Sequence, residues 1–216
     1  HDGLVTGTTP WFGGTGPSAD NEEIIRAEMN HFYFGTSVSL AVYASILPAL
    51  RVLNLEHCFN EGDLADLARR SPIVPRGRES LWGKALFQGF NYDFATSIHI
   101  LVPQIEHLVR MHLKVAGAVT TFINYSAGGR ETENGLGALM KLPETETVFG
   151  KNLSYEISAL FCEFTGPNLR NDVAHGLLDD QQISSVYSVY AWWFGLKLVV
   201  RSLLQFLDSD NPEQQE

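Results

Sequence analysis

Cysteine is scarce in this sequence, with Cys58 and Cys162 the two examples among 216 residues. Two thiols next to phenylalanines cannot form the disulfide framework of a small secreted domain, and they favour reduced, buried cysteines in a cytoplasmic protein. Basic residues are also few, since 15 Lys and Arg against 25 Asp and Glu give a net charge of −10. Phosphate backbones are bound through Lys and Arg, so this balance excludes a surface that coats nucleic acid but allows a local basic pocket.

Long apolar segments are few, and the first residues show no basic region followed by an apolar stretch, so we expect no secretory signal. Residues 32–50 and 186–207 are long enough to span a membrane. The first contains Pro48 and several hydroxyl side chains, and the second is interrupted by Lys197 and Arg201. We therefore expect two buried core helices and no membrane span.

Several motifs of catalysis and cofactor binding are missing. The sequence has no G-x-S-x-G elbow of the serine hydrolases, and no Lys-Ser/Thr pair follows the glycines of residues 13–17 as a phosphate-binding loop requires. His99, His107 and His112 share one predicted helix, but their spacings of eight and five do not direct three nitrogens to one metal. We expect neither a metal nor a cofactor.

Helical patterns dominate, and strand-like alternation is nearly absent. With 44% hydrophobic residues the chain can bury a sizeable core. We predict an all-α fold with an N-terminal lead-in and helical extension over residues 1–75, a helical domain over 76–207 and a disordered tail over 208–216. The expected helices are 21–55 with a break near Pro48, 61–70, 91–115, 151–164 and 186–207, with a loop over 126–143. The tryptophans are expected in the core or at a dimer surface, namely Trp82, Trp192 and Trp193.

One short string gathers side chains capable of chemistry, Arg170-Asn171-Asp172-Val173-Ala174-His175-Gly176. Pro167 suits a first helical position, and Gly176 suits the left-handed residue that ends a helix. Asn171 and His175 are then one turn apart on the same face. Arg170 lies about 100° around the helix from Asn171. The string therefore predicts a composite site, completed from elsewhere or across a subunit interface.

A second group lies on the predicted helix 91–115. His99, Pro103, Glu106 and Arg110 follow one another at intervals of four, three and four, as a polar stripe beside the apolar one. Such a stripe can face a site. The alternative is a surface ion pair between Glu106 and Arg110, which contributes about 0.3–0.5 kcal/mol.

These segments resemble an uncharacterised protein family defined by an RNxxxHG motif, a branch of the HEPN superfamily. The resemblance covers roughly residues 76–178 and rests on four segments, which are Pro75-Arg76-Gly77-Arg78-Glu79, Gly89 to Asp93, Leu101 to Arg110 and Asn168 to Gly176. It implies an all-α HEPN-like helical bundle that forms a homodimer. Many HEPN domains are metal-independent endoribonucleases in which an R-x(4–6)-H motif forms the active site at the dimer interface, a spacing that Arg170 and His175 match.

The resemblance also implies roles for these residues. His175 transfers protons, as imidazole does near neutral pH, and the guanidinium of Arg170 holds the phosphate of RNA. Asn171 orients the substrate or His175. Glu106 and Arg110 support Arg170 or its helix, and His99 belongs to the same supporting stripe. The 2′-hydroxyl then attacks the phosphate and leaves cyclic phosphate ends.

Two other interpretations of the motif remain open. Asn171 and His175 can cap and bridge helices without any chemistry. A HEPN-like module can also bind a nucleotide, RNA or a protein partner without cutting. A buried His175 with a single partner favours these interpretations, whereas two Arg170/His175 pairs that converge in a cleft reached by solvent favour the ribonuclease.

Overall fold

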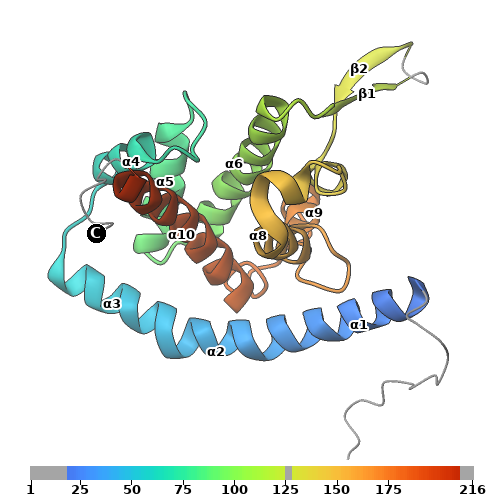
Figure 1. Cartoon of the computed structure of the whole chain (residues 1–216). Helices are drawn as coiled ribbons and strands as arrows, with labels where there is room; N and C mark the ends of the chain where they lie inside the picture. The colour runs from blue at the N-terminus through green and yellow to red at the C-terminus, as the bar shows by residue number, and fades with distance from the viewer. Residues whose placement is uncertain (1–18, 125–127, 210–216) are drawn as a thin grey trace, which may run out of the picture.

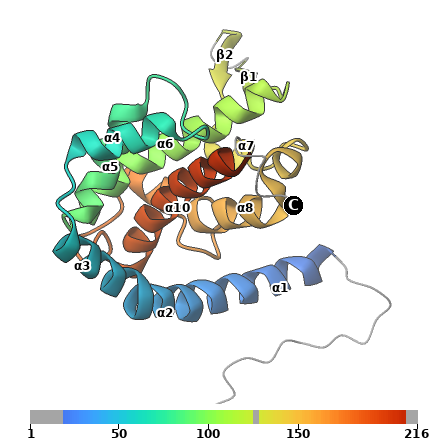
Figure 2. The same cartoon turned by 60° about the vertical axis from the view of Figure 1, so that its left-hand side comes forward.

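A computed structural model describes residues 19–124 and 128–209, and most of these residues are helical, which confirms the all-α prediction at that level. The long N-terminal helix runs along one side of a bundle formed by the other helices (Figures 1 and 2). The elements in chain order are α1 (Ala19–Phe32), η1 (Tyr33–Val38), α2 (Ser39–Ala41), η2 (Val42–Ile46), α3 (Leu47–Glu56), α4 (Glu61–Arg70), α5 (Glu79–Phe90), α6 (Phe94–Val115), β1 (Thr121–Asn124), β2 (Arg130–Glu133), α7 (Leu136–Leu139), α8 (Thr145–Phe161), α9 (Leu169–His175) and α10 (Val186–Ser209).

The helix α1–α3 is continuous and contains two π-helical segments, η1 and η2. Its buried side chains recur every four residues, at Asn30, Phe34, Val38, Val42, Ile46 and Leu50. A regular α-helix has about 3.6 residues per turn, so a spacing of four would drift around it. The wider π turns correct that drift and keep the buried stripe facing the bundle. Pro48 does not break the helix, contrary to the prediction, and it lies directly after the π-helical segment η2, at the second residue of α3.

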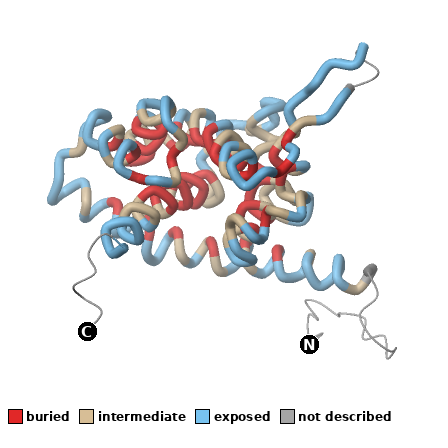
Figure 3. Tube along the Cα trace, turned by 45° about the horizontal axis from the view of Figure 1, so that its top comes forward, coloured by how far each residue is buried: buried red, intermediate tan, exposed pale blue. Residues whose placement is uncertain are grey.

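Most of this long helix is exposed, which corrects the expectation that residues 32–50 form a buried core helix (Figure 3). Phe32, Leu40 and Tyr43 are 65%, 65% and 66% exposed. Among the described residues, the stretch Asn21–Glu56 of this helix is the one that is long and apolar enough to cross a membrane, and 22% of its most apolar window is buried. The prediction was wrong because apolar residues lie on both sides of the helix, and one side alone contacts the bundle.

Helix α4 occupies the predicted residues, and its start is fixed by a capping box. The Asn60 side chain accepts from the N–H of Asp63, whose carboxylate accepts from the N–H of Asn60. α4 packs closely against α5, since a Cβ added to Gly83 would lie 2.5 Å from the backbone nitrogen of Ala65. Residues before and after the predicted boundary at 75–76 therefore share one hydrophobic core. α6 begins three residues later than predicted, where Asp93 caps it.

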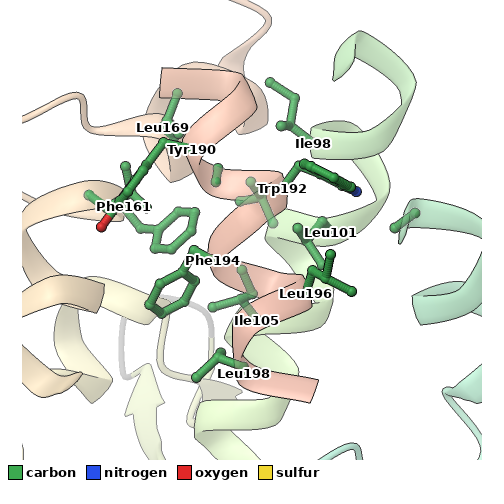
Figure 4. Packing of buried hydrophobic residues seen from close by; sticks show 14 of the residues in the cluster. Ile98, Leu101, Ile105, Phe161, Leu169, Tyr190, Trp192, Phe194, Leu196 and Leu198 are labelled. Atoms are coloured by element: carbon green, nitrogen blue, oxygen red, sulfur yellow. The ribbon is translucent and has the colours of Figure 1, made fainter. Parts of the chain in front are cut away.

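Helix α10 lies in the middle of the core, with α6 on one side and α8 on another (Figure 4). Its apolar residues are mostly buried, which confirms the second predicted core helix. Trp82 and Trp192 are 0% and 1% exposed, as the core interpretation predicted, and Trp193 is half-buried. The indole N–H of Trp192 donates to the carbonyl of Leu86 at 2.9 Å. This bond satisfies the polar atom of a large side chain in the interior.

The predicted loop over residues 126–143 contains regular structure in its described part, so that prediction was wrong. β2 pairs antiparallel with β1, with Thr121 opposite Glu133, and the ribbon projects from the bundle (Figure 1). α7 follows, anchored by the fully buried Leu136 and Leu139. α8 starts six residues before the predicted position, and its backbone is broken at Gly150, where φ is 73°. The predicted helix start at residue 151 directly follows this break.

The predicted lead-in before residue 18 and residues 210–216 of the predicted tail lie outside the described residues. Asp208 and Ser209 belong to α10, so the tail prediction was wrong for them. Cys58 and Cys162 are free thiols. Cys58 is exposed, which corrects its predicted burial, because it lies in the connection after α3. Cys162 is half-buried, and burial raises the pKa of its thiol to about 12.

Candidate functional site

The motif residues form the short helix α9, which packs against α6 and α8 on the side where the ribbon projects (Figure 1). It ends at Gly176, whose φ of 64° is left-handed as predicted. Pro167 does not occupy the first turn, contrary to the prediction, because Asn168 is left-handed at φ 50° and delays the start to Leu169. Gly166 lies where an added Cβ would be 2.0 Å from the carbonyl oxygen of Ala159, so the connection lies close against α8. Leu169, 2% exposed, anchors α9 in the core.

Glu106 joins two of the predicted site arginines. Its Oε2 accepts from Arg170 Nε at 2.8 Å, and its Oε1 accepts from Arg110 Nη2 at 2.7 Å. The side chains of Glu106 and Arg110 are 16% and 13% exposed, and that of Arg170 is 35% exposed. One carboxylate on α6 therefore fixes a guanidinium on α9, with the rest of that guanidinium free for another partner.

The surroundings of Glu106 act on its pKa in opposite directions. Burial raises the pKa of the carboxyl. Hydrogen bonds from Arg110 and Arg170 and the charge of Arg170 together lower it by more than burial raises it, so the pKa lies below its usual range. Glu106 is therefore ionised at neutral pH. Each of its carboxylate oxygens accepts from one of the two arginines, so Glu106 acts as a positioning residue that holds both guanidinium groups in place.

Arg110 has further contacts toward the ribbon. Its Nη2 donates to the carbonyl oxygen of Asn134 at 2.8 Å. Its Nε lies 3.2 Å from Glu133 Oε2, an ion-pair distance, but the N–H is not directed at that oxygen and is a buried donor without a hydrogen bond. We take this contact as an ion pair alone. Glu133 is better paired with Lys114, whose Nζ lies 2.6 Å from its Oε1.

A pocket of about 330 Å³ opens beside this ion triad, between α6, α9 and the residue before α5. Three predicted site residues, Glu106, Arg110 and Arg170, line it, as does Pro103 of the predicted stripe. Three other residues that line the pocket were not predicted to belong to the site, namely Arg78, Gln104 and His107. The sequence did contain signals for them. His107 directly follows Glu106 on α6, and Gln104 lies two residues before it. Arg78 belongs to the basic segment before α5.

The other predicted site residues do not line this pocket. His175 is exposed at the last position of α9, and its side chain makes no hydrogen bond or ion pair with any described residue. The Asn171 amide donates to Asp172 Oδ1 at 3.3 Å and not to His175. His99 is exposed on α6, and its Nδ1 lies 2.8 Å from the carbonyl oxygen of Ala95. The structure thus brings together Arg170, Glu106 and Arg110, but leaves the three others apart from them.

Cavity size does not identify the site. A larger cavity, about 840 Å³, lies between α8 and α10 and contains none of the predicted site residues. Its Lys197 is paired with Glu156 at 2.7 Å. Within residues 19–124 and 128–209, no group of three His, Cys, Asp or Glu could hold a metal ion. No protein-family model, curated protein or solved structure matches the chain.

Replacing Glu106 with Gln is expected to lower the free energy of unfolding by about 1–3 kcal/mol at pH 7, because two charged donors lose their ionised acceptor. Glu133→Gln is the matched control, since it makes the same change at a carboxylate that also contacts Arg110 but is 47% exposed. This exposed pair is worth less than about 1 kcal/mol. Urea unfolding of the three proteins measures the difference.

The effect of Glu106→Gln is also expected to depend on pH. The folded-state pKa of Glu106 is lowered, so its stabilisation is complete above the unfolded pKa of about 4.3 and is lost as pH falls through the folded value. The gap between wild type and Glu106→Gln should narrow as the pH is lowered from about 6 to below the unfolded pKa of about 4.3. A gap of constant size over this range would contradict the ionised role of Glu106.

Proposed function

We propose that the protein is a metal-independent endoribonuclease that acts as a homodimer of HEPN-like helical bundles. One observation carries the proposal: α9 presents a guanidinium fixed by Glu106 near one end and an exposed, unpaired imidazole at the other. The His175 side chain is exposed and makes no hydrogen bond or ion pair with a described residue, so its ring is free to exchange protons with a substrate.

The geometry of α9 supports a site shared between two copies. Arg170 and His175 are five residues apart, which puts their Cα atoms about 140° apart around the helix and about 7.5 Å apart along its axis. One copy therefore directs these two side chains away from each other. A two-fold pairing of α9 with its equivalent would bring Arg170 of one copy toward His175 of the other.

The reaction then requires no metal. One imidazole removes the proton of a ribose 2′-hydroxyl, whose oxygen attacks the adjacent phosphorus. The bond from phosphorus to the 5′-oxygen breaks, and a second imidazole protonates that leaving oxygen. The products are a 2′,3′-cyclic phosphate and a 5′-hydroxyl. Arg170, which Glu106 holds in place, stabilises the negative charge that develops on the phosphate oxygens.

The test is incubation of the purified protein with end-labelled single-stranded and structured RNA in the presence of EDTA. We expect new fragments with cyclic phosphate ends, because no step uses a metal ion. Size-exclusion chromatography with light scattering measures the oligomeric state of the same sample. A folded dimer that leaves both RNAs intact would overturn the proposal and favour a non-catalytic binding module.

A further inference from the structure

The pocket beside the ion triad is cationic in a chain that is acidic overall. Three arginines line it, Arg78, Arg110 and Arg170, against one carboxylate, that of Glu106. The chain has 15 basic residues against 25 acidic ones, so three arginines at one small pocket are a local reversal of charge. Guanidinium groups placed in this way bind phosphate strongly, since they are planar donors that match its oxygens.

Several polar atoms of the residues that line this pocket have no hydrogen-bond partner among the described residues. The side chains of Arg78, which is half-buried, and of His107 make no hydrogen bond or ion pair with the described residues. Arg110 Nε is a buried donor without a hydrogen bond. Gln104 is 6% exposed, and its Oε1 is likewise buried without a partner. Buried polar atoms are nearly always paired, so these atoms indicate a ligand.

We propose that this pocket binds the phosphate group of a nucleotide or of an RNA chain within a single copy of the protein. Arg78 and the free N–H groups of Arg110 and Arg170 donate to the phosphate oxygens. Gln104 Oε1 accepts from a hydroxyl of the attached sugar, a role that suits an acceptor among donors. A volume of about 330 Å³ is at the lower end for ligand pockets and accommodates a phosphate with the sugar attached to it.

Anion binding in this pocket is coupled to protonation of His107. The charged groups that act on it are Arg78 just before α5, Arg110 and Lys114 on α6 and Glu133 on β2. Glu106 and Arg170 line the same pocket. Burial, followed by the charges of Arg78, Arg110 and Lys114, lowers the pKa of His107 below its usual range. A bound anion offsets these positive charges and accepts from the ring, so binding takes up a proton.

The pocket shares Arg170 with the proposed cleavage site but does not depend on cleavage. The two proposals therefore fail separately. RNA cleavage without phosphate binding would overturn the phosphate-pocket proposal and support the ribonuclease proposal. Phosphate binding by a protein that leaves RNA intact would overturn the ribonuclease proposal and support the phosphate pocket.

Isothermal titration with inorganic phosphate, adenosine monophosphate and a 2′-deoxy oligonucleotide tests the pocket. We expect saturable binding that Arg78→Ala weakens about tenfold or more, the value of a hydrogen bond to a charged group. Arg76→Ala is the matched control, since it removes an exposed arginine two residues away that does not line the pocket. Comparing the mononucleotide with the oligonucleotide distinguishes a free nucleotide from a nucleic acid chain as the source of the phosphate.

The pH dependence is measured with sulfate, which keeps its charge where phosphate titrates. Sulfate affinity should rise as pH falls from about 7.5 to about 5.5 in wild type and should not rise in His107→Gln. Circular dichroism confirms folding of each variant, and His107→Gln remains informative if Arg78→Ala does not fold. Equal affinities for wild type, Arg78→Ala and Arg76→Ala, or the same pH dependence in His107→Gln, would overturn the proposal.

Discussion

The His175→Ala protein is expected to cleave RNA about 10²- to 10⁴-fold more slowly than wild type in EDTA, the range that one proton-transferring residue contributes. His175 is exposed and makes no contact that holds the fold together, so its removal should leave the free energy of unfolding within about 0.5 kcal/mol of wild type. Single-turnover cleavage of labelled RNA and urea unfolding measure the two quantities on the same protein. A fall in activity with unchanged stability separates a catalytic histidine from a structural one.

His57→Ala is the matched control, because it removes another exposed histidine, located just after α3 at the far end of the long helix (Figure 1). It should cleave RNA as wild type does. Mixing wild type with an excess of His175→Ala, under conditions that exchange subunits, should lower the activity of the wild-type chains, since each mixed dimer has lost one of the two imidazoles that the reaction uses. If His175→Ala keeps full activity, the assignment of this residue is wrong.

Gly89→Ala is expected to lower the free energy of unfolding by about 3 kcal/mol, near the upper part of the usual cost of overpacking. A Cβ at Gly89 would lie 2.1 Å from both Cδ1 and Nε1 of the Trp192 ring. Trp192 is 1% exposed and hydrogen-bonded to Leu86, so the ring cannot move without breaking that bond. The midpoint of thermal unfolding should fall by about 6–12 °C.

Gly35→Ala makes the same chemical change without the clash, because Gly35 is exposed on the long helix and an added Cβ meets nothing within 4 Å. It should raise the free energy of unfolding by about 0.4–1 kcal/mol, since alanine has less freedom to lose on folding. Calorimetry of both variants measures the contrast. Similar stabilities for Gly89→Ala and Gly35→Ala would mean that α5 and α10 are not packed as closely as described.

Helix ends were predictable where the signal is local. Asn60 and Asp63 cap α4 through hydrogen bonds over three residues, and Gly176 ends α9 through its own backbone conformation. The start of α9 was missed because the left-handed Asn168 has no reliable sequence signal. The ribbon was missed because short exposed strands lack the alternation that burial of one face imposes.

The candidate site was predicted in part. Helical spacing placed Glu106 and Arg110 on one face of α6, and the ion pair between them is present. Arg78 could not be assigned in this way, because it reaches the pocket through the packing of α5 on α6. His99 shares the stripe of Glu106 by spacing, but the pocket does not extend to it. Sequence spacing predicts which residues share a face of a helix. It does not predict which other elements pack over each turn of that face.

By itself, the sequence determined the helical class, most helix positions and the helical motif segment, because these depend on contacts within a few residues. Tertiary structure decided which side of the long N-terminal helix is buried, and it joined Arg170 to Glu106 across 64 positions of the chain. It also assembled the arginine-lined pocket. Such contacts depend on how whole helices pack around α10, and that packing is set by many side chains acting together, which no local pattern contains.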